Sequence, residues 1–311
     1  MAAGDQVGHK VVVRRVVGGT GRTFSDVVGV LVEADPSTLV VRRRDGSLVE
    51  IPRTEVAVTK SVPAAPRDVL ALEDVARLGW QAPRTRWLGR WLLRAADGWT
   101  GRANSVLPLG DPGLPLDAAL AEVTGWYADQ GLPARFCLPT PARELLAGAL
   151  AARGWTAYNP TGVLTADVGV ALRDWPDLGH AVPVAPEPDE EWLGLYHYRG
   201  GATLPPVART VLTGAREPGF ALLRVDGTPA AIARAAVDDG WVGVTAVEVD
   251  PAFRRRGLAT AVMRGVLAWA APRGAVGVYL QVADDNAAGR ALYDRLGFTR
   301  HHGYHYRLAP S

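Results

Sequence analysis

The chain has 311 residues, of which 48% are hydrophobic and 21% are charged, and its formal net charge at pH 7 is +2. This length predicts two or three domains with real cores, and the small net charge argues against a dedicated polyanion-binding protein. One cysteine excludes a disulfide framework, and we find neither a signal-peptide region nor a run of about 18 apolar residues. We therefore expect a cytoplasmic protein without a membrane partner.

Residues 1–62 are expected to form a small all-β barrel. Turn signals, such as those at 18–21, separate five short β-branched runs: Val11–Val13, Val27–Val32, Leu39–Arg42, Leu48–Ile51 and Val56–Val58. The runs resemble the strands of Src-homology-3-like barrels, with Pro52–Glu55 as a short helical turn before the last strand.

Six arginines of this segment raise the question of nucleic-acid binding: Arg14, Arg15, Arg22, Arg42, Arg43 and Arg44. However, residues 1–60 hold nine Lys/Arg against seven Asp/Glu, and Phe24 is their only aromatic residue. A solvated strand edge is therefore favoured over a nucleic-acid face.

An internal repeat follows the barrel. Asp97–Ala103 is echoed by Asp239–Thr245, and three further pairs keep a separation of 143 residues: Trp126 with Trp269, Gly131 with Gly274, and Gly154 with Gly297. Between these positions each copy reads as helix, strand, helix, glycine and aromatic residue. We interpret them as two copies of one α/β unit, at residues 67–175 and 185–311, with one proline-containing linker before the first copy and another near the start of the second.

The first copy is expected to be structural. It predicts a helix around Leu116–Tyr127, a strand at Ala134–Leu138 that buries Cys137, and a second helix whose apolar face would hold Leu145, Leu146, Ala149 and Leu150. Before the first helix, Gly110–Pro115 carries two prolines and an aspartate, which remove hydrogen-bond donors and repel phosphate. This copy would therefore extend the sheet and wall a cleft.

The second copy contains a predicted anion-binding loop. An apolar strand, Val244–Val249, runs into Asp250–Thr260, and the helix that follows has an apolar face formed by Leu258, Val262, Val266 and Trp269. The first turn of such a helix has unpaired N–H groups and a partial positive charge, and Arg254–Arg256 add phosphate donors. The glycine spacing is neither that of a dinucleotide fingerprint nor that of a P-loop. The segment predicts a site for a phosphate-bearing ligand.

The elements after this loop keep a recognisable order. A strand at Val276–Val282 precedes a helix that opens at Asn286 and stops at Gly297, and a last strand region runs from Phe298 to Leu308. The residues that carry a family resemblance are Val247–Val249, the pattern Arg254-x-x-Gly257-x-Ala259, and the segments Ala291–Tyr293 and Leu296–Phe298. This order resembles the GNAT superfamily of acyl-CoA-dependent N-acetyltransferases. Over both copies the resemblance implies an α/β (α+β) tandem GNAT fold with mixed, mostly antiparallel sheets, which some actinobacterial proteins place after a small barrel.

The resemblance implies acetyl-CoA as co-substrate and no metal. The pyrophosphate would lie on the backbone amides of Arg256–Thr260, and the pantetheine arm would pair with the strand at Val247–Val249. The residues expected to contact the co-substrate are Val247, Glu248, Val249, Arg254, Arg255, Arg256, Gly257, Leu258, Ala259, Thr260 and Asn286. Asn286 would also cap its helix.

Two residues are candidates for proton transfer. An acceptor amine with a pKa near 10.4 is neutral in only about one molecule in 2,500 at pH 7, a cost of about 4.6 kcal/mol that favours a general base. Glu248 is the candidate base, with a solvent-facing strand residue as the alternative. Tyr293 matches the tyrosine that many GNAT enzymes use as an acid toward the thiolate, and an amide at or near Val249 would polarise the carbonyl. Gln281 stands where N-terminal acetyltransferases often carry a glutamate, which weakens that interpretation.

Several polar residues remain open between a role in the site and ordinary packing. His301, His302 and His305 lie on the last predicted strand, where alternation puts His301 and His305 on one face and His302 on the other, and no cysteine or carboxylate cluster completes a metal site. The residues expected near the acceptor cleft, or else in the core, are Tyr196, His197, Tyr198 and Arg199 in an early helix, and Tyr304, His305 and Tyr306.

The predicted function is transfer of an acetyl group from acetyl-CoA to a primary amine, of a small molecule or a protein lysine, by direct attack in a ternary complex. One alternative is a small-molecule acetylase of the mycothiol-synthase kind, which also has tandem GNAT units. Another is a non-catalytic CoA-binding or scaffold protein. Nothing in the sequence selects the acceptor or the oligomeric state.

Overall fold

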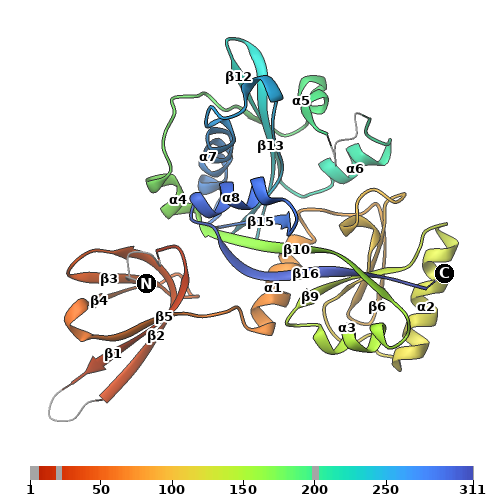
Figure 1. Ribbon diagram of the computed structural model, residues 1–311, viewed down its shortest axis with the longest axis horizontal. Coiled ribbons are helices and arrows are strands. Elements are labelled where there is room, and N and C mark those ends of the chain that lie inside the picture. The colour runs from red at the N-terminus through yellow and green to blue at the C-terminus, as the bar shows by residue number, and fades with distance from the viewer. Residues whose placement is uncertain (1–6, 19–22, 198–202, 311) are drawn as a thin grey trace.

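The computed structural model describes residues 7–18, 23–197 and 203–310. It shows a β domain at the N-terminus beside a larger α/β body, and the chain ends at the far side of that body (Figure 1). Part of the turn predicted at 18–21, Arg22, and the predicted helical residues Tyr198 and Arg199 lie outside the described residues.

The N-terminal domain is a five-stranded antiparallel sheet in the order β4-β3-β2-β1-β5. Its elements are β1 (Lys10–Val17), β2 (Thr23–Ala34), β3 (Thr38–Arg42), β4 (Leu48–Pro52), the 3₁₀ turn η2 (Arg53–Glu55) and β5 (Val56–Ser61). Alternate residues of the strands point inward, so that β-branched and leucine side chains form one core: Val11, Val13, Val27, Leu31, Leu39, Val41 and Ile51. The predicted small β domain is confirmed, including the helical turn before its last strand.

Ion pairs join this domain to the body. Arg42 pairs with Asp167, which is buried and caps the helix that follows it. Lys10 donates to Asp68 at 2.6 Å. Arg42 is therefore engaged within the protein, which lowers the number of arginines on this domain that are free to meet a nucleic acid.

The body contains both copies of the repeat. The first supplies α1 (Pro66–Ala76), β6 (Arg84–Leu88), β7 (Trp91–Ala95), η3 (Arg102–Asn104), β8 (Leu107–Pro108), α2 (Leu116–Asp129), β9 (Arg135–Thr140), α3 (Glu144–Ala151), β10 (Thr156–Asp167) and α4 (Val168–Asp174). The second supplies β11 (Val184–Ala185), α5 (Glu190–Leu195), α6 (Val207–Thr213), β12 (Pro218–Val225), β13 (Thr228–Asp238), β14 (Trp241–Val249), η5 (Pro251–Phe253), α7 (Leu258–Ala270), η6 (Ala271–Arg273), β15 (Gly277–Ala283), α8 (Ala287–Arg295) and β16 (Thr299–Leu308).

One eight-stranded sheet runs through both copies in the order β11-β12-β13-β14-β15-β10-β16-β9. Among its described strands β14 and β15 form the one parallel pair, so the predicted mixed, mostly antiparallel sheet is confirmed. A smaller sheet of β6, β7 and β8 lies in the first copy.

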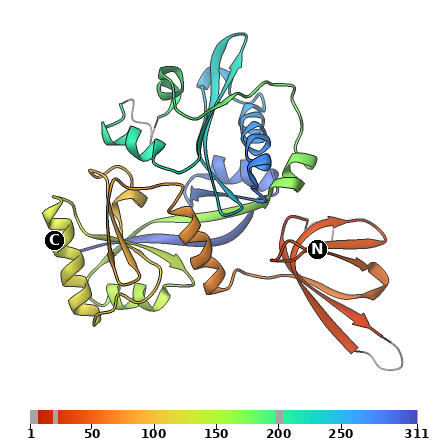
Figure 2. The ribbon, with the colours of Figure 1, turned by 180° about the vertical axis from the view of Figure 1, so that it is seen from behind.

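The two copies exchange their last strands. β10 of the first copy lies between β15 and β16 of the second, and β16 in turn pairs with β9 of the first. Both strands cross the middle of the molecule side by side (Figures 1 and 2). The division into 67–175 and 185–311 stays a prediction, and the two segments share one sheet.

Helices cover both faces of the second copy's strands. α7 lies on one face, where Leu258, Val262 and Val266 are buried as the spacing predicts, and α5 and α6 lie on the other (Figure 1). Two predicted faces are wrong. Leu145 on α3 is 93% exposed, because Ala147 and Leu150 supply that helix's buried positions. For α8 the sequence predicts an apolar face of Ala288, Leu292 and Leu296, but in the described structure this helix has no fully buried residue and Ala288 is exposed.

Candidate active site

A cavity of about 400 Å³ opens where β14 and β15 separate. The two strands pair in parallel from Trp241 with Gly277 to Val244 with Leu280, and then diverge. Beyond Val244, the edge of β14 that faces β15 has no partner among the described strands. Its backbone N–H and C=O groups are therefore available to a ligand that enters the gap.

A β-bulge changes the direction of β14 at this point. Its register against β13 moves from Thr245 opposite Arg234 to Glu248 opposite Ile232, so β14 has one residue more than its partner. Ala246 takes up the extra residue with φ 51°, a left-handed conformation that costs free energy in an alanine. The bulge turns the strand away from β15 and brings the side chains that follow to the cavity.

Glu248 lies on the cavity wall and is held by the segment after α5. Its Oε1 accepts a hydrogen bond from the backbone N–H of His197 at 2.9 Å, and its Oε2 is 3.5 Å from the Nδ1 atom of the same histidine. The side chain is 27% exposed. Burial raises the pKa of Glu248 above its ordinary value, although the contacts with His197 act in the opposite direction. A raised pKa makes the carboxylate a stronger proton acceptor.

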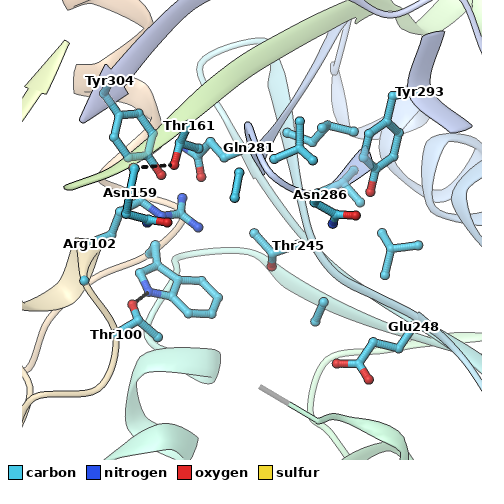
Figure 3. A pocket seen from close by; sticks show the side chains of 18 of the residues that line it. Thr100, Arg102, Asn159, Thr161, Thr245, Glu248, Gln281, Asn286, Tyr293 and Tyr304 are labelled. Carbon is cyan, nitrogen blue, oxygen red and sulfur yellow. Dashed lines mark hydrogen bonds between the residues drawn. The ribbon is translucent and has the colours of Figure 1, made fainter. Parts of the chain in front are cut away.

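Tyr293 reaches the cavity from α8, on the other side of the gap (Figure 3). The ring is half-buried and packs edge-on against Phe298, with ring centroids 5.6 Å apart. Burial raises the pKa of Tyr293 to about 12. The hydroxyl therefore keeps its proton at neutral pH and can donate it.

Asn286 also lines the cavity and begins α8. Its side-chain oxygen accepts a hydrogen bond from the backbone N–H of Gly289 at 2.9 Å, which confirms the predicted helix cap. Val247 is another lining residue of the cavity.

The start of α7 has the properties of an anion site. Gly257 is the N-cap with φ 78°, and no side chain of the described residues caps the helix. The N–H groups of Leu258–Thr260 precede the first helical hydrogen bond, which Ala261 makes to Gly257, so they are left for an external acceptor. The left-handed φ of Gly257 favours a glycine, and a Cβ atom there would also lie 2.7 Å from the end of the Leu178 side chain.

The three arginines before this turn are exposed and lie outside the cavity lining. The side chain of Arg254 donates a hydrogen bond to the backbone oxygen of Val249 at 3.3 Å, and the Arg256 guanidinium lies 5.5 Å from the Phe253 ring centroid. Within the described parts of the chain, none of the three has a carboxylate partner. Their charges are free to meet an anion at the mouth of the gap.

The first copy closes the inner end of the cavity. Trp80, Thr100, Gly101 and Arg102 line it, and Trp80 donates to the Thr100 hydroxyl at 3.0 Å. Figure 3 shows Arg102, Asn159, Thr161 and Tyr304 on one side of the cavity, Glu248, Asn286 and Tyr293 on the other, and Thr245 and Gln281 between them.

Tyr304, Tyr306, Tyr196 and His197 line the cavity as expected, whereas His305 is not among the lining residues. Tyr196 and His197 follow α5 rather than lie within a helix, because α5 ends at Leu195. Trp80, Thr100 and Arg102 were not predicted as cavity residues. For Arg102 the internal repeat held a signal, because this arginine takes the place of the strand residue Val244.

The histidine prediction is wrong in its geometry. His302 lies opposite Val163 and Arg300 opposite Leu164, so His301 is the extra residue of a bulge. The Nδ1 atoms of His301 and His302 are consequently 2.8 Å apart, and His302 Nε2 is 2.9 Å from Oε1 of Glu73, with both side chains buried. No group of three potential metal-ligating side chains occurs among the described residues.

Comparison with known proteins gives the family. A family model described as the C-terminal region of the probable histone acetyltransferase Rv0428c matches residues 67–307. The chain belongs to this Rv0428c family. A second model, described as the Rv0428c N-terminal Sm-like domain, matches residues 5–60 and specifies the kind of small β domain found here.

Two relatives extend the family match. The probable histone acetyltransferase Rv0428c of Mycobacterium tuberculosis is 32% identical over 100% of this chain and 98% of its own length. The uncharacterized N-acetyltransferase YobR of Bacillus subtilis is 27% identical over 78% of this chain and 98% of its own. This Rv0428c-family protein is thus an acetyltransferase, which confirms the predicted enzyme class.

Solved structures agree on the fold. A GCN5-related N-acetyltransferase from Kribbella flavida is similar with a TM-score of 0.58 at 20% identity, over 80% of this chain and 97% of that one. A tandem GNAT protein from the clavulanic acid biosynthesis pathway has a TM-score of 0.53 at 18% identity, over 80% and 91% of the two chains. In the parts of the Rv0428c-family chain that the structure describes, no helix is both long enough and apolar enough to traverse a bilayer.

Proposed function

We propose that the protein moves an acetyl group from acetyl-CoA to a primary amine in the cavity between β14 and β15. The observation that carries this proposal is the position of the gap. The free edge of β14 leads from the cavity, past Glu248, to the uncapped start of α7. A thioester with a long amide-containing arm and a pyrophosphate has matching groups in the same order.

The residues present fit acetyl-CoA. The N–H groups of Leu258–Thr260 and the charges of Arg254–Arg256 would hold the pyrophosphate. The edge of β14 at Val247–Val249 would pair with the amides of the pantetheine arm, and Asn286 faces it from α8. When bound, acetyl-CoA supplies the activated acetyl group.

The chain's own residues supply the proton transfers. Glu248 takes the proton of the acceptor ammonium, directly or through a water molecule, and its raised pKa suits that role. Tyr293, whose pKa is about 12, donates its proton to the departing thiolate and is reprotonated by the proton that the nitrogen loses as the amide forms. An amide at or near Val249 polarises the carbonyl. The amine attacks directly, so no covalent enzyme intermediate is required.

The acceptor is proposed only as a class. The M. tuberculosis relative is named a probable histone acetyltransferase, which makes a protein lysine one candidate. A small molecule of the kind used by mycothiol-synthase-like enzymes is the other, because the cavity of about 400 Å³ is closed at its inner end by the first copy. A non-catalytic CoA-binding role is the remaining alternative.

The test combines binding with turnover. Calorimetry should show that the full chain binds acetyl-CoA, and CoA release should then depend on an amine from a panel of polyamines, amino acids and histone peptides. Replacing Arg254, Arg255 and Arg256 together by glutamine should weaken binding, while the same change at the exposed Arg216 should not. Binding without amine-dependent release would favour the scaffold alternative, and absence of binding would refute the proposal.

A further inference from the structure

The inner end of the cavity holds a guanidinium that the acetyl-transfer chemistry does not use. Arg102, on η3 of the first copy, lines the cavity and points toward Gln281 and Thr245 (Figure 3). Its guanidinium carbon lies 5.2 Å from the centroid of the Trp80 ring, and its side chain has no hydrogen-bond acceptor among the described residues. A half-buried guanidinium with five donors and no acceptor is a binding group for an anion.

Two neighbours on the cavity wall are also unsatisfied. Both polar atoms of the Gln281 amide, and the hydroxyl of Thr245, are buried without a hydrogen-bond partner in the described structure. Buried polar atoms cost free energy unless they are paired, so three such atoms beside one guanidinium indicate a place for a polar group. Gln281 can donate through its nitrogen and Thr245 through its hydroxyl.

The surrounding charge is positive. Arg234 is 1% exposed, its guanidinium carbon lies 5.0 Å from a ring centroid of the same Trp80, and its Nη2 atom lacks a partner among the described residues. Glu73 is the carboxylate that acts on Arg102 here, and it is hydrogen-bonded to His302 instead. The opposite end of the cavity carries the carboxylate of Glu248.

The repeat explains how an arginine came to lie there. Arg102 corresponds to Val244, which in the second copy belongs to the long strand β14. In the first copy that strand is reduced to Leu107–Pro108, and the 3₁₀ turn η3 takes its place. Because the strand is shorter, the side chain of Arg102 lines the cavity of the second copy.

We propose that the inner end of the cavity binds a carboxylate, so that the acceptor is an amine that also carries a carboxylate group, as an amino acid does. Arg102 binds the carboxylate with its planar fork, Gln281 and Thr245 complete the contact, and the amine points to Glu248. This proposal rests on the proposed acetyl transfer and names its substrate class.

The carboxylate site is tested with amines that are similar in structure but differ in their acidic group. CoA release is measured with L-lysine, L-lysinamide and cadaverine, which differ in the carboxylate, and with O-phosphoethanolamine, which replaces it by a phosphate. We expect kcat/KM to be roughly 10- to 100-fold higher for L-lysine than for the other three compounds, mainly through KM. Arg102→Met should lower kcat/KM for L-lysine much more than for cadaverine and so remove that preference, Arg102→Lys should restore part of it, and the exposed control Arg216→Met should behave as the wild type.

Acetyl-CoA binding, measured on each variant by calorimetry, separates the two proposals. If acetyl-CoA does not bind, acetyl transfer itself is wrong. If it binds and L-lysine has no advantage over cadaverine, or O-phosphoethanolamine is preferred, the carboxylate site is wrong. An equal loss for all amines in Arg102→Met would show a structural role only. Should that variant fail to fold, the wild-type comparison and Arg102→Lys decide the matter.

Discussion

At the residue scale, Glu248 predicts the pH dependence of the reaction. Because burial raises its pKa, the carboxylate becomes protonated, and useless as a base, at a higher pH than an ordinary glutamate. The acidic limb of kcat/KM should therefore lie above the usual carboxyl range. Glu248→Gln should lower kcat by about 100-fold and abolish this limb. The exposed Glu190→Gln on α5 serves as control, and an unchanged profile in Glu248→Gln would exclude the base role.

Tyr293 makes a different prediction at the same scale. Its pKa of about 12 keeps the hydroxyl protonated from pH 6 to pH 9, so Tyr293→Phe should lower kcat by a factor that is constant over this range. We expect a loss of roughly 10- to 100-fold, with little change in acetyl-CoA binding measured by calorimetry. An effect on KM alone would reduce Tyr293 to a packing residue against Phe298.

Single residues were predictable where a local motif names them. Glu248, Asn286 and Tyr293 lie within short segments whose order is read along the chain, and all three reach one cavity. Arg102 could not be predicted from the sequence. Its importance depends on Gln281, which is distant in the sequence and comes close to Arg102 only because the two copies pack together. No local pattern records that an amide or a guanidinium will lack a partner.

At the element scale, the start of α7 allows a matched pair of substitutions. Gly257→Ala places a Cβ at φ 78° and against Leu178, so we expect a loss of about 1 kcal/mol or more in the free energy of unfolding. It should also raise the KM for acetyl-CoA. Gly274→Ala, at φ 86° and with open space around it, should cost similar stability without that effect. Equal KM values in the two variants would contradict a phosphate site at α7.

Helices and strands were predictable here and bulges were not. Hydrophobic patterns and turn residues locate these elements, because α7 buries one face and β14 and β15 are short apolar runs bounded by turns. The extra residues Ala246 and His301 have no recognisable pattern in the sequence, because the position of a bulge depends on the pairing with the neighbouring strand. Alternation therefore failed for His301 and His302, while it held for Tyr304 and Tyr306.

At the scale of the whole molecule, the strand exchange makes the two copies interdependent. β10 and β16 each pair with a strand of the other copy, so neither copy has a complete sheet by itself. The repeat was visible in the sequence, but the exchange was not, because both arrangements bury the same residues of the strands. The exchange also places Trp80 and Arg102 of the first copy at the cavity of the second.

The hydrogen-bonded chain Glu73–His302–His301 links α1 to β16 and predicts how acid destabilises the protein. Burial, and then the charge of His302, lower the pKa of His301 to about 4, against 6.5 in the unfolded chain. Above pH 6.5 the lowered pKa of His301 does not reduce the free energy of unfolding, because the imidazole is neutral in both the folded and the unfolded chain. Between pH 6.5 and pH 4 the unfolded chain takes up a proton that the folded protein refuses, so the free energy of unfolding falls as the pH falls.

His301→Gln removes this titration and keeps a hydrogen-bonding group beside His302. We expect the decrease in Tm from pH 7 to pH 5, measured by calorimetry, to be smaller in this variant than in the wild type. The exposed His180→Gln should retain the wild-type decrease. Glu73 acts at lower pH. Burial, the largest single cause, raises its pKa, but the His302 hydrogen bond and the nearby positive charges together lower it, so the stability it contributes is lost only as the pH falls below the ordinary carboxyl range. A wild-type Tm that stays constant from pH 7 to pH 5 would show that His301 accepts its proton within the folded protein.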